Sequence, residues 1–111
     1  MMKIAMSPAA GALLRALIAR SGVDRNRILL TEVHSTDWRS LTFTGERHHI
    51  GLRVTGAGPA KVVQRMCGDL ADAEFSIPGV IVADVALVGT PAKTADGAIQ
   101  VMIEALTVSD D

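Results

Sequence analysis

The densest group of reactive side chains lies between His34 and Arg39, in the run His-Ser-Thr-Asp-Trp-Arg. His34 and Asp37 together are able to exchange a proton, and Arg39 adds a cation that is able to hold an anionic group. We expect this run to connect two strands, with Asp37 and Arg39 as candidate loop residues. In the structural alternative, Asp37 makes a local turn bond, Trp38 packs at the sheet margin and Arg39 is solvated. The absence of a nucleophile motif favours that alternative.

Two adjacent histidines, His48 and His49, are candidate metal ligands. Adjacent residues of a strand point to opposite faces of the sheet, so the two imidazoles cannot bind one ion from a regular strand. We expect His49 on the open face of the sheet, together with His34 and Glu32. No metal-ligand motif accompanies them. We therefore predict solvated or interface histidines, no metal and no cofactor.

Asp84 and Glu104 are a second candidate pair, because the expected strand pairing makes them diagonal neighbours on one face of the sheet. Paired carboxylates divide acid and base roles when their environments separate their pKa values. The favoured alternative is an ion network with Arg53 or Arg39, within one chain or across a dimer interface. The open face thus carries the candidate ligand or interface residues His34, His49, Arg53, Asp84 and Glu104.

Two amphipathic helices are expected to position these strands. The first has Ser7 as its N-cap, Pro8 at its first position and Gly22 at its end. The second begins at Pro59, and apolar residues recur along it every three or four positions, with the lone cysteine among them. That apolar stripe comprises Val62, Val63, Met66, Cys67 and Leu70. Each helix has one apolar face, so each needs a sheet to cover it.

The remaining apolar segments predict the strands of that sheet. They are residues 27–35, 38–44, 50–55, 80–88 and 98–108. The resulting order is helix, three strands, helix, two strands. Alternation and loop parity predict three core pairs: Phe43 with Ile50, Leu41 with Leu52, and Leu87 with Ile99. The opposite face keeps many apolar residues among its charges, which favours a cover such as a second copy of the chain.

Length and composition set the class of the protein. A chain of 111 residues with 49% hydrophobic residues suits one domain, residues 1–111, and a formal charge of −1 with only three aromatic residues argues against nucleic acid. The single cysteine suits a reducing compartment, so we expect a cytoplasmic protein. The sequence has no apolar run long enough to span a membrane. The predicted fold is a two-layer α+β sandwich with two helices on one face of a mostly antiparallel sheet of four or five strands, ferredoxin-like by analogy.

Three functions fit this fold. The first is a non-catalytic domain that forms a homodimer through its open sheet face, with room for a small-molecule ligand in a shared pocket. The second is a small acid/base enzyme, a hydrolase or isomerase, that uses Asp84 with Glu104 or His34 with Asp37. The third is a subunit that joins a larger assembly through an exposed strand edge. Because no motif supports catalysis, we expect the first.

Overall fold

The computed structural model describes residues 6–109, and residues 1–5 and 110–111 lie outside this range. Two helices and five strands follow one another, with two short 3-10 turns between them. In chain order they are α1 (Pro8–Ser21), η1 (Arg25–Arg27), β1 (Ile28–Arg39), β2 (Thr44–Val54), α2 (Pro59–Cys67), η2 (Leu70–Asp72), β3 (Val80–Leu87), β4 (Ala92–Lys93) and β5 (Ile99–Ser109).

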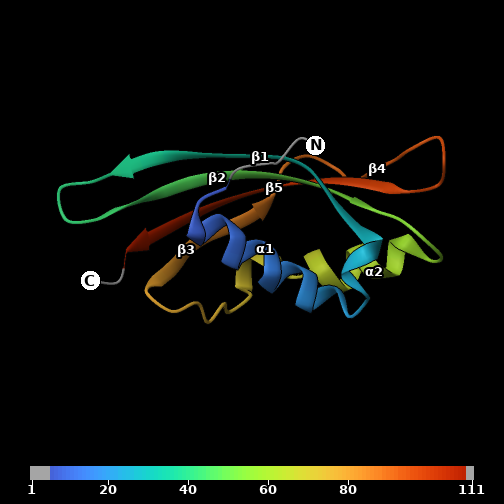
Figure 1. The fold of residues 1–111 in the computed structure, drawn as a ribbon, viewed down its shortest axis with the longest axis horizontal. Coiled ribbons are helices and arrows are strands. Elements are labelled where there is room, and N and C mark those ends of the chain that lie inside the picture. The colour runs from blue at the N-terminus through green and yellow to red at the C-terminus, as the bar shows by residue number, and fades with distance from the viewer. Residues whose placement is uncertain (1–5, 110–111) are drawn as a thin grey trace.

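The strands form one antiparallel sheet in the order β1-β2-β5-β3, with the two-residue strand β4 also paired to β5. Both helices lie on the same side of this sheet (Figure 1). We call the side that meets the helices the inner face and the other side the outer face. The predicted two-layer α+β arrangement is confirmed, and the ferredoxin-like comparison stays an analogy.

The ends of both helices follow the expected local chemistry. The Ser7 hydroxyl accepts a hydrogen bond from the Ala10 amide at 3.2 Å, and Pro8 occupies the first turn of α1. Gly22 ends α1 with φ of 73°, a left-handed conformation that glycine adopts without a steric cost. Helix α2 begins at Pro59, as predicted.

The hydrophobic core fills the space between the helices and the inner face. Leu13 and Leu17 of α1, Met66 of α2, Leu52 of β2 and Ile103 of β5 are all fully buried. Their burial explains why two helices with a single apolar face are stable on this sheet. The Cys67 thiol belongs to the same cluster, as predicted for a core residue, and burial raises its pKa to about 11.

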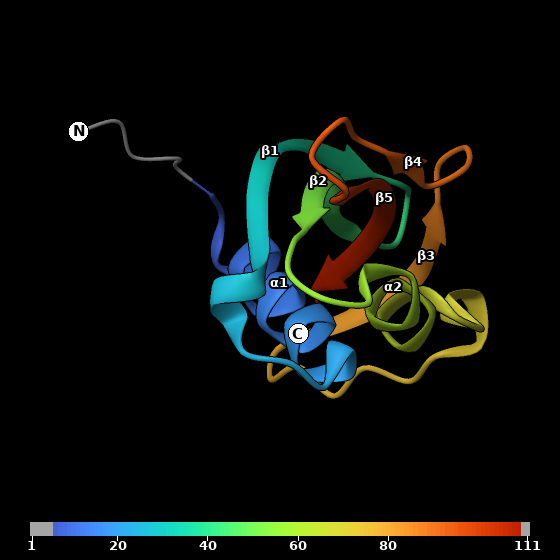
Figure 2. The same cartoon turned by 90° about the vertical axis from the view of Figure 1, so that its right-hand side faces the viewer.

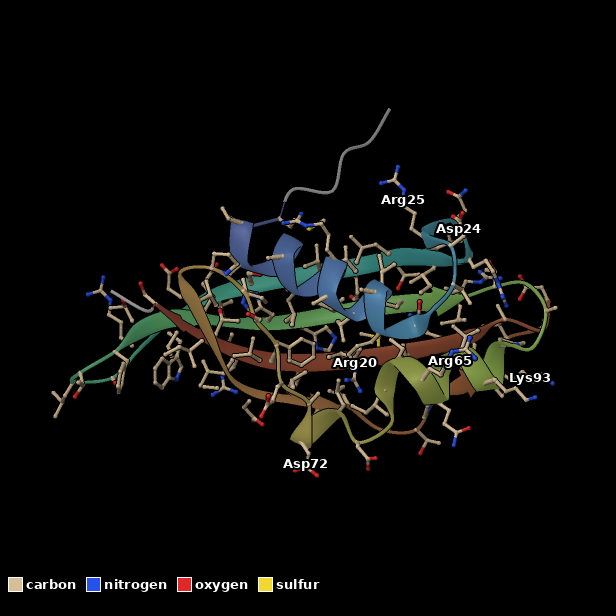
Figure 3. The ribbon with its side chains drawn as sticks, turned by 90° about the horizontal axis from the view of Figure 1, so that it is seen from below. Arg20, Asp24, Arg25, Arg65, Asp72 and Lys93 are labelled. Carbon is tan, nitrogen blue, oxygen red and sulfur yellow. The ribbon has the colours of Figure 1, made fainter. Side chains whose placement is uncertain are left out.

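Two arginines join the C-terminal ends of the two helices. Arg20 of α1 donates to the carbonyl oxygens of Met66 and Gly68 at 3.1 and 2.9 Å, and Arg65 of α2 donates to the Ser21 carbonyl oxygen at 2.8 Å. Figure 3 shows both side chains between the helices. Because the last carbonyls of a helix lack partners within it, each arginine completes the hydrogen bonding of the opposite helix. We call this pair the arginine clamp.

The predicted first hairpin is wrong in its boundaries and its register. β1 runs without a break to Arg39, and residues 40–43 form the turn. Leu41 is fully exposed and Phe43 half-exposed in this turn, so neither belongs to the core. The core partners of β2 are instead residues of β1: Val33 lies opposite Ile50, and Leu30 lies opposite Leu52.

The predicted last hairpin is displaced by four residues. Leu87 lies opposite Ile103 instead of Ile99, because residues 88–98 contain β4 and a tight turn from Thr94 to Ala98. Figure 2 shows this excursion between β3 and β5. A displacement by an even number of residues leaves every side chain on the same face of the sheet. Val85, Leu87 and Asp84 therefore keep their predicted faces. The start of β3 does not, because a bulge between Val82 and Asp84 turns Val82 toward the core and Ile81 to the outer face.

Candidate functional site

A row of titratable side chains crosses the outer face at the middle of the sheet. His34 of β1 lies opposite His49 of β2, and His49 lies opposite Glu104 of β5. The two imidazole rings are 6.4 Å apart between centroids, and Nδ1 of His49 is 3.4 Å from Oε1 of Glu104. Antiparallel pairing thus brings together three residues that the sequence predicted on one open face.

Glu32 completes this row from the neighbouring position on β1. Its two carboxylate oxygens lie 3.6 Å from Nε2 of His34 and 3.6 Å from Nε2 of His49. Gly51 makes this possible, because a Cβ at that position would lie 2.9 Å from the Glu32 Cγ and 3.1 Å from the Met102 sulfur. We call Glu32, His34, His49 and Glu104 the outer-face cluster. In it, His49 lies between the carboxylates of Glu32 and Glu104.

Arg53 is also on the outer face, but its partner is not the one expected. Its guanidinium forms an ion pair with Asp96, in the turn before β5, instead of with Asp84 or Glu104. The Thr94 hydroxyl, the Ala98 amide and then Arg53 hold the pKa of the Asp96 carboxyl below its usual value. This pair ties the turn of residues 94–97 to the central strand β2.

Asp84 lies on the outer face of β3, opposite Leu106 and therefore diagonal to Glu104. The diagonal relation is the one predicted, although the strands pair four residues further along. The three cavities described along this chain are lined by other residues. None of these three cavities therefore serves as a substrate site for a reaction between Asp84 and Glu104.

The proposed pair of His34 and Asp37 is contradicted by the continuity of β1. Asp37 lies opposite Glu46, and both point to the inner side of the sheet, as Ser35 and His48 do two residues away. His34 is on the outer face. Residues three apart in a strand point in opposite directions, so the two cannot form a proton pair. Asp37 and Arg39 are therefore exposed strand residues, and the predicted candidate loop is wrong.

A buried polar group that was not predicted from the sequence lies on the inner face. His48 is 1% exposed, and its Nδ1 lies 2.7 Å from the Ser35 hydroxyl while its Nε2 lies 2.8 Å from the Thr107 hydroxyl. Burial lowers the pKa of His48, against the opposing effect of the Glu46 carboxylate. The alternation along β2 that places His49 on the outer face also places His48 on the inner face, so the sequence did indicate that His48 is buried. Its hydrogen-bond partners, Ser35 and Thr107, could not be predicted in this way, because they depend on the pairing of three strands.

Within residues 6–109, no group of three or more histidine, cysteine or acidic side chains has an arrangement suited to a metal ion. None of the described helices is long and apolar enough to cross a bilayer. The outer-face cluster is therefore best understood as hydrogen-bonding and ion-pairing groups on an open surface. The sequence matches no known family model, and no curated protein shows significant similarity to it.

Proposed function

We propose that this chain is a self-associating domain that dimerises by placing the outer faces of two sheets against each other. The observation that carries the proposal is the uncovered outer face, since α1 and α2 both lie on the inner one (Figure 1). Three aliphatic side chains at its margins are 40–48% exposed: Leu29, Ile81 and Val88. Apolar residues that stay exposed beside charges are typical of interfaces.

Charge complementarity favours a second copy as the occupant. The outer face carries acidic residues, Glu32 and Glu104, and basic residues, Arg47 and Arg53, on the same few strands. A two-fold dimer in which the acidic groups of one copy meet the basic groups of the other would be electrostatically complementary. Between the two sheets, the outer-face cluster would also present imidazole and carboxylate groups from both copies to a small ligand.

The size of the outer face also supports a dimer. Strands β1, β2, β5 and β3, of 12, 11, 11 and 8 residues, cover roughly 650 Å² at about 3.3 Å per residue and about 4.8 Å between strands. A stable interface of standard size buries about 800 Å² on each partner. A face-to-face contact over the whole sheet is therefore large enough to hold two copies together.

The test is the solution mass of the full chain by size-exclusion chromatography with light scattering. We expect a dimer for the wild type and a monomer for Leu29→Asp combined with Ile81→Asp, which bury two charges in the proposed interface. The matched control is Ala60→Asp, an exposed position of α2 in the other layer, which should remain dimeric. A wild-type monomer at high micromolar concentration would overturn the proposal, and so would a dimer that survives both outer-face substitutions.

A further inference from the structure

The buried group on the inner face has the arrangement of a nucleophile, a base and a third residue that orients the base. Ser35 comes from β1, His48 from β2 and Thr107 from β5, and both hydrogen bonds to the imidazole are shorter than 3 Å. A hydroxyl becomes a useful nucleophile when an adjacent imidazole is able to take its proton. The sheet pairing of three strands fixes all three side chains.

The direction of the hydrogen bonds decides which imidazole nitrogen is free to act as a base. The Thr107 hydroxyl donates to the Glu46 carbonyl oxygen at 3.5 Å, so it is available to accept from the Nε2–H of His48. A neutral imidazole carries one N–H, and burial favours this neutral form of His48 by lowering its pKa, although the Glu46 carboxylate acts in the opposite direction. Nδ1 therefore has a lone pair directed at the Ser35 hydroxyl, which donates to it.

Ser35 is accessible although its base is buried. It lines a cavity of about 270 Å³ together with Met6, Ser7, Val33 and Glu46. Ser7 is the N-cap of α1, so the positive end of a fourteen-residue helix lies beside this cavity and would stabilise negative charge that develops there. The cavity thus has a nucleophile beside a helix N-terminus, with the acidic side chain of Glu46 also in its lining.

A second cavity adjoins the first at Met6. It has a volume of about 440 Å³ and runs along α1, and its other lining residues are Gly11, Leu14, Arg15, Ile18 and Arg25. Figure 3 shows Arg25 at the margin of the molecule, next to Asp24. Leu14 and Ile18 give this cavity an apolar wall. A short acyl chain is therefore able to lie along α1 while its carbonyl group is next to Ser35.

We propose that Ser35 is the nucleophile of an esterase site that hydrolyses carboxylic esters with a short apolar acyl chain. The Ser35 oxygen forms a bond to the acyl carbon, and its proton passes to Nδ1 of His48. The bond from the acyl carbon to the leaving alcohol then breaks, and the alcohol takes that proton. Water attacks the acyl-serine, gives a proton to Nδ1, and releases the acid as Ser35 recovers its hydrogen.

This activity goes beyond the proposed self-association and does not depend on it. Ser35, His48 and Thr107 lie on the inner side of the sheet, and the proposed dimer contact is on the outer face. A monomeric protein with a reactive Ser35 would refute only the dimer. A dimeric protein with an unreactive Ser35 would refute only the esterase site.

The test uses diisopropyl fluorophosphate, which labels an activated serine by forming a phosphorus–oxygen bond with loss of fluoride. We expect one diisopropylphosphoryl group per chain, located on Ser35 by peptide mass spectrometry. Hydrolysis of p-nitrophenyl butyrate should be lost in Ser35→Ala and fall by about 100-fold or more in His48→Gln. The matched control is Ser76→Ala, an exposed serine before β3, which should react like the wild type.

Thr107 is proposed as a positioning residue, so its test needs a second readout. Thr107→Val removes the acceptor that fixes the Nε2–H tautomer, and we expect a lower turnover together with a changed pH profile. Circular dichroism of each variant establishes that it is folded. The proposal is overturned if the folded wild type takes up no label, or if the label is found on Ser7 or persists in Ser35→Ala.

Discussion

Removing the arginine clamp from one side tests how the two helices are held together. Arg20→Ala deletes two hydrogen bonds from a charged donor, one part-buried to Met66 and one exposed to Gly68. It also removes a cation 5.9 Å from the centre of the Phe75 ring. The C-terminal carbonyls of α2 would then have only water as a partner.

The expected magnitude follows from the exposure of these contacts. A hydrogen bond from a charged group contributes about 1.5 kcal/mol at the low end of its range, and the exposed bond contributes less because water competes for it. The contact with Phe75 adds about 0.5 kcal/mol. We expect Arg20→Ala to lower the free energy of unfolding by about 2 kcal/mol, which in a chain of this size lowers Tm by about 8 °C.

Urea unfolding followed by circular dichroism measures this loss through the midpoint at constant slope. The matched control is Arg15→Ala, an exposed arginine on the same helix, for which we expect a change of about 0.5 kcal/mol or less. In a double-mutant cycle with Arg65→Ala, the two losses should not add, because both residues join the same pair of helix ends. If Arg20→Ala is as stable as Arg15→Ala, the clamp contributes nothing and this explanation of the helix pair is wrong.

Two further predictions concern the sheet. Because the pKa of His48 is lowered from 6.5 in the folded state, the unfolded chain binds the proton first, so the free energy of unfolding should fall as pH drops below about 6.5. Urea midpoints measured against pH should show this fall in the wild type, and the fall should be smaller in His48→Gln. Gly45→Ala should destabilise the protein by about 3 kcal/mol, since a Cβ there would overlap the Thr107 carbonyl oxygen of the adjacent strand. Gly11→Ala, where the new Cβ would make only ordinary contacts, should instead be neutral or stabilising in thermal unfolding.

Local chemistry was enough to predict the helices and the layers. Ser7, Pro8 and Gly22 act through their own side chains and backbone preferences, so their roles can be read without knowing the fold. The alternation along β2 likewise separated His48 from His49 correctly. The faces of the sheet followed from this alternation, which is why the outer-face residues were found together.

Strand boundaries and pairing were not predictable in the same way. Residues 36–39 contain a single apolar side chain, Trp38, so the sequence gives no repeated apolar alternation to indicate that β1 continues through them. The Ser40 hydroxyl accepts hydrogen bonds from the amides of Thr42 and Phe43 and closes the turn at residues 40–43, so Phe43 is a turn residue and not a strand residue. To predict the Ser35–His48–Thr107 group, one would need the register of β2 with β1 and with β5, and both registers are set by the tertiary structure.

The strand order has a consequence for how the chain folds. β2 pairs with β5, so residues 45–54 meet residues 99–108 in the centre of the sheet, and β3 also reaches the sheet only through β5. The strand that joins the two halves is thus the last one to be synthesised. Until β5 emerges from the ribosome, β2 has one unpaired edge and β3 has no partner strand. The cooperative folding step must therefore wait for β5, and the nascent chain has an exposed edge that a chaperone or another chain is able to bind.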